Sequence, residues 1–269
     1  MLSSCRLTIL VGLLSLLSLP ALGQSTDQLQ VGPPPAHRAE PPSAGASAED
    51  LEKQGDILRA GKNYLDAIDY YKAALKKAPE GGALLFNKMG ICYLQMQRSK
   101  EAAKNFNHAI KADRNNANAY NNLGVVYYEQ KNYGKAIKLY EKAITIDANA
   151  ASYYSNVGAA YFGKKEFEKA TENYSKALSL DPDIFERLSQ AGVQAQLPSP
   201  EDRARYDYVL AKLYARMGAP DRSLHYLKKA MEDGYKDIGN VYKDAEFAGL
   251  RKDPRFVELM AAKPPAITE

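Results

Sequence analysis

A pattern of 34 residues recurs along the middle of this chain, and it constrains the fold more than any other feature. Similar blocks begin at Ala48, Ala83, Ala117 and Ala151, and the last three starts are spaced by 34 residues. Small residues recur at fixed places: the eighth position holds Gly55, Gly90, Gly124 and Gly158, the twentieth Ala67, Ala102, Ala136 and Ala170, and the twenty-seventh Ala74, Ala109, Ala143 and Ala177. Self-similarity at this period is typical of stacked structural units.

Each block predicts two helices. Positions 4, 7, 8 and 11 form one stripe of a first helix, and positions 20, 24 and 27 form one stripe of a second. Glycine and alanine remove bulk where the two helices approach. Aromatic residues such as Phe86, Tyr120 and Tyr140 fill the space between hairpins. Because a single hairpin leaves an apolar face exposed, the hairpins must stack.

The columns resemble the tetratricopeptide repeat family, whose pattern runs aromatic, Leu-Gly, Tyr, Ala, aromatic, Ala, Pro. The closing proline is present as Pro79 and Pro182 and is replaced by Arg114 and Ala148. The resemblance assigns four repeats to residues 48–182 and implies an all-α solenoid. The departures affect the turns between repeats.

The regular spacing ends after Pro182. Residues 183–203 read as an irregular helical connector, with a short helix from Phe185 to Gln196 that Leu197-Pro198-Ser199-Pro200 ends. A divergent fifth hairpin is predicted over 204–235, with Pro220 in the first turn of its second helix. Capping helices follow over 236–262, and 263–269 is a tail. The predicted fold is an all-α solenoid of about five hairpins with C-terminal capping helices.

The first 23 residues have the features of a secretory signal. Arg6 precedes an apolar run over 7–19, and small residues, Ala21 and Gly23, mark a cleavage site before Gln24. The run is shorter than the roughly 20 residues that span a membrane, although retention as an uncleaved anchor is the alternative. We therefore expect an exported protein, periplasmic or secreted. Residues 24–47 are rich in Pro, Ala, Gly and Ser and predict a disordered tether.

Composition excludes several kinds of site. The 36 basic and 32 acidic residues leave a net charge of +4, without the lysine and arginine stripe that nucleic acid binding needs. Only Cys92 remains after cleavage, so no internal disulfide forms, and this cysteine reads as a small buried residue. The three histidines lie far apart, with His108 and His225 expected on helix surfaces. No metal, cofactor or catalytic constellation is expected, and the protein is not predicted to be an enzyme.

The family resemblance implies a concave groove lined by positions 2, 5, 6, 9, 12 and 13 of each first helix. Amide side chains there suit the backbone of an extended peptide, and an apolar and aromatic stripe beside them exceeds what the repeat core requires. The candidate partner-binding residues are Asn87, Ile91, Leu94, Asn121, Asn122, Val125, Tyr128, Ser155, Asn156 and Phe162. The alternative is that these columns only pack the repeats together.

We therefore expect an exported module that binds a peptide or a partner protein, for example in assembling an envelope complex. The alternative function is a structural scaffold that self-associates through the same stripe and has no peptide ligand. Membrane contact is expected only through the transient signal. A specialised family clamp for acidic C-termini uses Lys and Asn at positions 5 and 9 of its first repeat. Glu52 and Asp56 stand there in this chain and are expected to repel a carboxylate.

Overall fold

The computed structural model describes residues 40–186 and 199–262. Every regular element in these two ranges is a helix, and none of the described helices is long and apolar enough to cross a membrane. The predicted signal over 1–23, most of the tether, most of the short helix after Phe185 and the tail lie outside the described residues.

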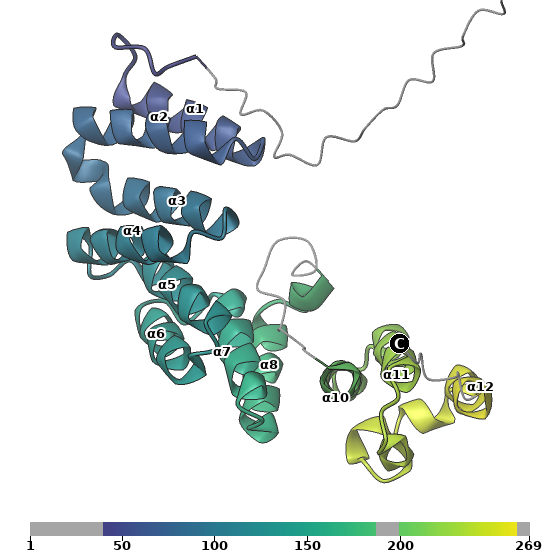
Figure 1. Ribbon diagram of the computed structural model, residues 1–269. Helices are drawn as coiled ribbons and strands as arrows, with labels where there is room; N and C mark the ends of the chain where they lie inside the picture. Colours follow the sequence, from purple (N-terminus) through teal and green to yellow (C-terminus); the bar gives the residue numbers. More distant parts are fainter. Residues whose placement is uncertain (1–39, 187–198, 263–269) are drawn as a thin grey trace, which may run out of the picture. The chain divides into compact units, whose positions relative to one another are not determined.

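The helices come in pairs that follow one another along the chain (Figure 1). The pairs are α1 (Ala48–Ala60) with α2 (Tyr64–Lys77), α3 (Gly82–Gln95) with α4 (Ser99–Ala112), α5 (Ala117–Glu129) with α6 (Tyr133–Ile146), α7 (Ala151–Gly163) with α8 (Phe167–Leu180), and α10 (Pro200–Arg216) with α11 (Pro220–Glu232). A short 3-10 turn, η1 (Pro79–Gly81), precedes α3. The predicted all-α solenoid of about five hairpins is confirmed.

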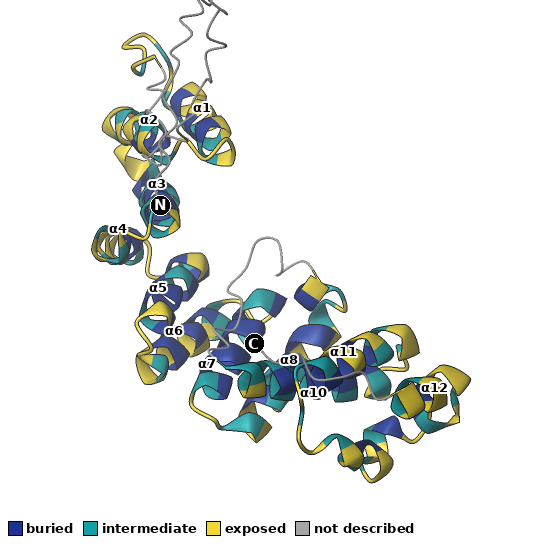
Figure 2. Ribbon diagram, turned by 45° about the vertical axis from the view of Figure 1, so that its right-hand side comes forward, coloured by how far each residue is buried: buried dark blue, intermediate teal, exposed yellow. Residues whose placement is uncertain are grey.

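The repeated glycine allows the two helices of a hairpin to approach. A Cβ atom placed on Gly55 would lie 2.6 Å from the ring of Tyr71, and one on Gly124 would lie 2.5 Å from the ring of Tyr140. Both rings are completely buried. The buried residues face each other inside the pairs, and the exposed ones lie on the outside (Figure 2). The glycine at position 8 therefore leaves room for the aromatic ring at position 24 of the same hairpin.

The turn inside each of the first four hairpins places a non-glycine residue in the left-handed region. These residues are Lys62, Gln97, Lys131 and Lys165, with φ between 58° and 64°. The following amide then donates to a carbonyl in the last turn of the first helix, as Asn63 N does to Leu58 O at 2.8 Å. This closure is the Schellman arrangement, for which glycine is the usual residue. The fifth hairpin has it, as Gly218.

The fifth hairpin begins earlier than predicted. Ser199 caps α10, accepting from Asp202 N at 3.1 Å, and Pro200 occupies the first turn. The predicted start at 204 is too late because Pro200, which the sequence suggested as the end of the preceding helix, is well suited to the first turn of α10. Pro220 starts α11, as predicted.

Helix α10 meets α8 differently from the way earlier first helices meet the preceding hairpin. In the array, Tyr153 near the start of α7 packs with Ala143 near the end of α6. By contrast, Tyr206 near the start of α10 packs on Tyr174 in the middle of α8, and Arg205 lies over the ring of Phe167 at the start of α8. Arg216 at the end of α10 donates to Ser175, further along α8. The contacts thus run in the same order along both helices.

The chain after α11 closes the fold with short turns. These are η2 (Ile238–Tyr242), η3 (Ala245–Phe247), η4 (Leu250–Lys252) and α12 (Pro254–Ala262). Val241, Phe247, Leu250 and Phe256 are buried in one cluster with residues of α10 and α11. The predicted cap therefore consists of three 3-10 turns and one helix.

Part of the predicted disordered tether has tertiary contacts. The carbonyl oxygen of Glu40 accepts from the Tyr70 hydroxyl at 2.9 Å, and that of Ala44 accepts from Lys77 Nζ at 2.8 Å. Ala46 packs against the first hairpin, and Ser47 caps α1. For residues 40–47 the prediction of disorder was wrong, because composition does not show which backbone carbonyls a neighbouring helix will bind.

Candidate partner-binding face

The predicted asparagines lie together on one face of α3, α5 and α7, which we call the first-helix face. Asn156 Nδ2 donates to Asn121 Oδ1 at 2.8 Å, Asn121 Nδ2 to Asn122 Oδ1 at 3.2 Å, and Asn122 Nδ2 to Asn87 Oδ1 at 3.0 Å. Each of these three bonds uses one N–H of the donor and one oxygen of the acceptor. The four amides therefore form a hydrogen-bonded chain that joins three hairpins.

These contacts follow the repeat. The side chain at position 6 of one hairpin donates to the side chain at position 5 of the hairpin before it, as Asn122 does to Asn87 and Asn156 to Asn121. At the first junction Lys88 takes the position-6 role and Glu52 the position-5 role, with Nζ and Oε1 2.6 Å apart. Sequence columns read one repeat at a time do not show this link, because donor and acceptor belong to different repeats.

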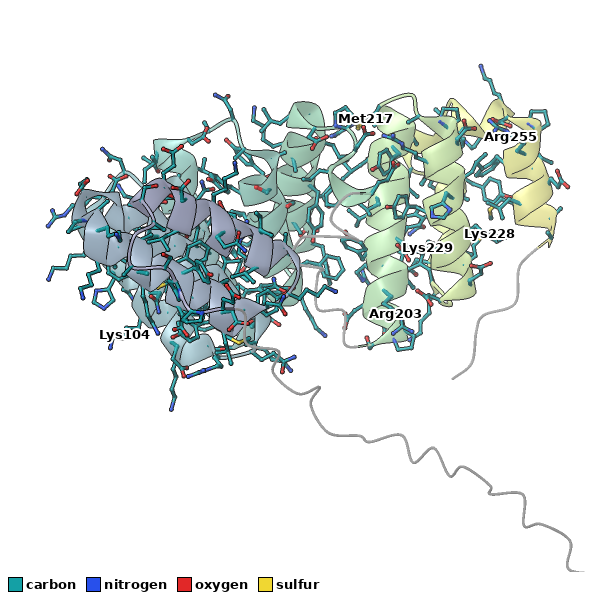
Figure 3. The ribbon with its side chains drawn as sticks, turned by 90° about the horizontal axis from the view of Figure 1, so that it is seen from above. Lys104, Arg203, Met217, Lys228, Lys229 and Arg255 are labelled. Atoms are coloured by element: carbon teal, nitrogen blue, oxygen red, sulfur yellow. The ribbon has the colours of Figure 1, made fainter. Side chains whose placement is uncertain are left out.

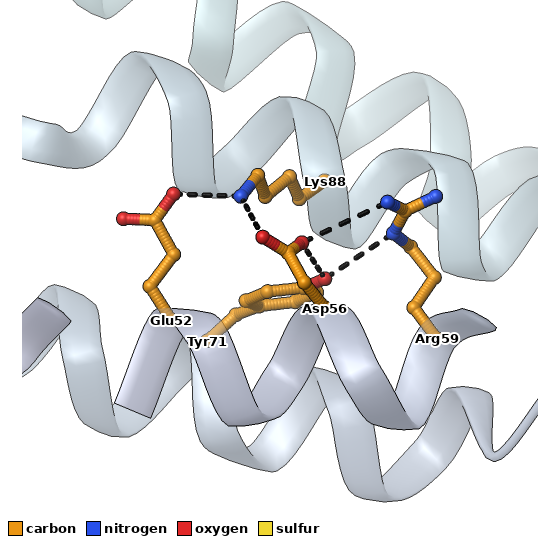
Figure 4. Close-up of polar contacts among 5 residues, drawn as sticks. All are labelled: Glu52, Asp56, Arg59, Tyr71 and Lys88. Carbon is orange, nitrogen blue, oxygen red and sulfur yellow. Dashed lines mark hydrogen bonds and ion pairs between the residues drawn. The ribbon is translucent and has the colours of Figure 1, made fainter. Parts of the chain in front are cut away.

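Lys88 also binds Asp56, so that one ammonium group holds two carboxylates (Figure 4). Asp56 accepts in addition from the Tyr71 hydroxyl at 2.8 Å, and Arg59 completes the cluster. Burial works to raise the pKa of Asp56, but hydrogen bonds from Lys88 and Tyr71 and the nearby charges bring this pKa below its usual value.

The two carboxylates of this cluster are balanced by Lys88 and Arg59. The expectation that Glu52 and Asp56 would repel an acidic partner therefore lacks its physical basis. What the structure shows instead is that Lys88 is already engaged by groups of its own chain, and an acidic partner would have to displace them.

The predicted apolar stripe is mostly part of the core. Val125, Tyr128 and Phe162 are each less than a tenth exposed, as are Asn87, Asn121, Ser155 and Asn156. Tyr128 packs on Tyr133, and Phe162 packs on Phe167 and Tyr206. The expectation that these three side chains exceed the needs of the core was wrong, because positions 9 and 12 of one hairpin are filled against the next one.

The accessible apolar surface of this face lies on α3. Leu84 is 49% exposed, and Ile91 and Leu94 are partly exposed. Leu84, Lys88 and Ile91 follow one another at helical spacing, so they form a single stripe. Asn122 of α5 is also partly exposed, and its hydrogen bond to Asn87 places it next to α3. Of the ten predicted residues, only Ile91, Leu94 and Asn122 are therefore accessible, and the sequence reading passed over Leu84.

Two buried tyrosine hydroxyls have no hydrogen-bond partner within the described part of the chain. They belong to Tyr140 and Tyr174, at position 24 of the third and fourth hairpins. Burial raises the pKa of both well above the usual value. In the first hairpin, Asp56 at position 9 accepts from the equivalent Tyr71. Val125 and Ala159 occupy position 9 in the later hairpins and offer no acceptor.

The remaining reactive residues are placed as expected. Cys92 is completely buried, and burial raises the pKa of its thiol to about 11. His108 and His225 are exposed, and His108 stacks on Phe86. Within the described ranges, no group of three or more His, Cys, Asp or Glu side chains could hold a metal ion.

Residues 83–149 and 116–183 match the sequence model of the family described as tetratricopeptide repeat. Together these matches cover α3 to α8. Residues 83–183 thus match the tetratricopeptide repeat model, in agreement with the paired helices that the structure shows there.

Several solved structures are similar to this chain. MamA from Desulfovibrio magneticus RS-1 is 19% identical, with 75% of this chain and 100% of that chain covered and a TM-score of 0.49. A thermophilic TPR protein of Thermus thermophilus is 20% identical, with 80% and 100% covered and a TM-score of 0.49. YrrB, described as a TPR protein with an unusual peptide-binding site, is 18% identical, with 77% and 92% covered and a TM-score of 0.46.

Proposed function

We propose that this protein is exported and binds a segment of another protein on its first-helix face, with the contact centred on α3. The observation that carries the proposal is the accessible stripe of Leu84, Ile91 and Leu94 on α3, in contrast to the buried Val125, Tyr128 and Phe162 of α5 and α7. An exposed apolar patch rimmed by polar groups is typical of a protein contact site. Lys88 and Asn122 supply that rim.

The amide chain has a supporting role in this proposal. Its internal hydrogen bonds fix the spacing of α3, α5 and α7, so the apolar stripe is presented by a preorganised surface. Preorganisation reduces the entropy lost on binding. Asn122 keeps one N–H for a partner backbone, because its bond to Asn87 uses only the other one.

Export rests on the N-terminal apolar run and the small residues before Gln24. The mass of the protein purified from its native source tests this part. We expect a chain that begins at Gln24. A chain that retains residues 1–23 in the cytoplasmic fraction would contradict export and leave the binding face untouched.

Binding is tested by affinity capture from envelope and secreted fractions, quantified by mass spectrometry. Leu84→Asp places a charge in the stripe, and Leu65→Asp on α2 is the matched control, since Leu65 is 51% exposed and Leu84 49%. We expect Leu84→Asp to lower capture of a specific partner at least about tenfold, which corresponds to about 1.4 kcal/mol. The control should retain it.

Equal capture by both variants would contradict the stripe as the binding face. Light scattering of the same proteins measures their oligomeric state and distinguishes partner binding from the alternative of a self-associating scaffold. A concentration-dependent dimer that Leu84→Asp abolishes, with no captured partner, would show that the stripe serves self-association.

A further inference from the structure

Two outer helices have the largest excess of basic over acidic residues among the described α-helices. Helices α4 and α6 together carry six lysines against two glutamates, a surplus of four, which equals the net charge of the whole chain. Helix α8 carries two lysines and two glutamates, and α1 has an acidic excess. This excess therefore lies on the second helices of two successive hairpins.

Five of these lysines make no hydrogen bond or ion pair with the residues that the structure describes. They form what we call the outer lysine patch: Lys100, Lys104, Lys111, Lys138 and Lys142, all of them exposed. The sixth, Lys135, binds the hydroxyl of Tyr127 and lies over its ring. Figure 3 shows Lys104 pointing away from the helices.

The patch lies on the second helices of two successive hairpins. Leu139 of α6 packs against a buried cluster that holds Ala102 and Phe106 of α4 together with Leu123 and Val126 of α5, so one cluster joins the two hairpins. Lys104 and Lys138 occupy the same repeat position, the twenty-second, so stacking of successive hairpins turns both toward the same outer side.

Stability does not explain this arrangement. Lys100 and Lys104 are four residues apart on one helix, as are Lys138 and Lys142 on the other, and like charges at this spacing repel. Each of the other second helices has at least one lysine in an ion pair: Lys72 with Asp69 at 3.3 Å, Lys169 with Glu166 at 2.7 Å and Lys228 with Glu232 at 3.7 Å. The contrast indicates that the patch meets negative charge from outside the chain.

We infer that the outer lysine patch docks on a surface of anionic phospholipid head groups. Ammonium groups on flexible stems impose no bidentate geometry, which suits a diffuse negative surface, and lysines near such a surface attract it strongly. The choice of lipid over nucleic acid rests on the proposed export, because an exported chain meets head groups. The patch lies on second helices, so a partner can occupy α3 at the same time.

The test is partition of the full chain into vesicles of phosphatidylglycerol and phosphatidylcholine in equal proportion, relative to pure phosphatidylcholine. Taking this ratio cancels any contribution of the apolar N-terminus. We expect a clear preference for the anionic vesicles that fades at high salt as the Debye length shortens. The variant Lys104→Gln/Lys138→Gln/Lys142→Gln should lose about fivefold per lysine, on the order of 100-fold in total.

The matched control is Lys72→Gln/Lys169→Gln/Lys228→Gln, which removes the same charge from lysines whose side chains are 58%, 58% and 59% exposed. Retained binding by this control supports the inference. Equal loss in both triple variants, no preference of the wild type for anionic vesicles, or tighter binding to duplex DNA at the same salt would overturn it. Leu84→Asp should leave the partition unchanged, so failure of the partner-binding proposal remains distinguishable.

Discussion

The two helices of a hairpin pack closely in the first four hairpins and in the fifth, but different residues form the contact between them. In the first four, a glycine at position 8 receives an aromatic ring from position 24, as Gly124 receives Tyr140. In the fifth, Ala211 and Leu227 hold these positions, and both are completely buried. Ser223 at position 20 donates to the Ala211 carbonyl at 2.8 Å, where the other hairpins carry alanine. The hairpin geometry is thus preserved by a smaller ring-free side chain and an added hydrogen bond.

The two regions also differ in how hairpins are joined. Polar links from position 6 to position 5 run along the first four hairpins. At the junction with the fifth, position 6 is Val209, which cannot donate, and aromatic contacts of Tyr206 with Phe162 and Tyr174 take over. Hydrogen bonds are directional and impose the same arrangement at each junction between hairpins, whereas aromatic packing allows a different arrangement at the junction with the fifth hairpin. This difference accompanies the changed order of contacts between α8 and α10.

The largest expected effect concerns a charge that only the fifth hairpin buries. Asp207 is 4% exposed at position 4, where the other hairpins carry an apolar or aromatic residue. Burial raises its pKa to about 6, despite Lys229, which lies 3.7 Å away; Asp233 raises the pKa further, and Arg203 lowers it.

Because this pKa is higher in the folded than in the unfolded chain, folding binds a proton, and stability falls as pH rises from about 4 to about 6. A shift of about two units corresponds to about 3 kcal/mol. We expect the free energy of unfolding of the wild type, relative to Asp207→Asn, to decrease by about that amount between pH 4 and pH 7. Parallel pH profiles of the two proteins in urea titrations would contradict the assignment.

The next effect tests the packing of the aromatic ring on the glycine at position 8 in the first four hairpins. Gly124→Ala should destabilise by about 2 kcal/mol, because the added methyl group would meet the Tyr140 ring at 2.5 Å and the core would be overpacked. Gly134→Ala in α6 is the matched control, since nothing lies within 4 Å of its Cβ position. Alanine there should stabilise by up to about 1 kcal/mol. Chemical denaturation measures the free energy of unfolding of both variants. A stabilising effect of Gly124→Ala would contradict the close packing of the Tyr140 ring on Gly124.

A third comparison concerns buried hydroxyls. Tyr208 in the fifth hairpin donates to Asp244 at 2.9 Å, whereas Tyr140 has no partner among the described residues. Tyr208→Phe should cost about 1 kcal/mol, and Tyr140→Phe should gain about 1 kcal/mol, because an unsatisfied buried group carries its full desolvation penalty. Phe106 occupies the equivalent position of the second hairpin without a hydroxyl. Thermal unfolding of the two variants should therefore shift in opposite directions.

The smallest effect concerns the turns. Lys165 adopts φ 64° in the fourth hairpin, and Gly218 adopts φ 72° in the fifth. Lys165→Gly should stabilise by up to about 1 kcal/mol, since glycine enters the left-handed region without strain. Gly218→Ala should destabilise by about 1 kcal/mol for the converse reason. Shifts of the same sign in a denaturant titration would show that the turns are controlled by other contacts.

The helical hairpins and their stacking could be predicted from the sequence alone. The repeat period, the apolar stripes and the columns of small residues are local properties. Gly55 lies against Tyr71 of its own hairpin, so a single repeat contains the information. The starts of α5 and α7 at Ala117 and Ala151 coincide with the block starts for this reason.

Accessibility of the predicted site residues, and what they bind, depends on the tertiary structure. Asn156 donates to Asn121 across two repeats, and Phe162 packs against Tyr206 of the fifth hairpin. Lys104 and Lys138 are exposed at the same repeat position of successive hairpins. Each of these outcomes depends on the distance between hairpins. That distance is set by packing of the whole array, which no single column of the repeat encodes.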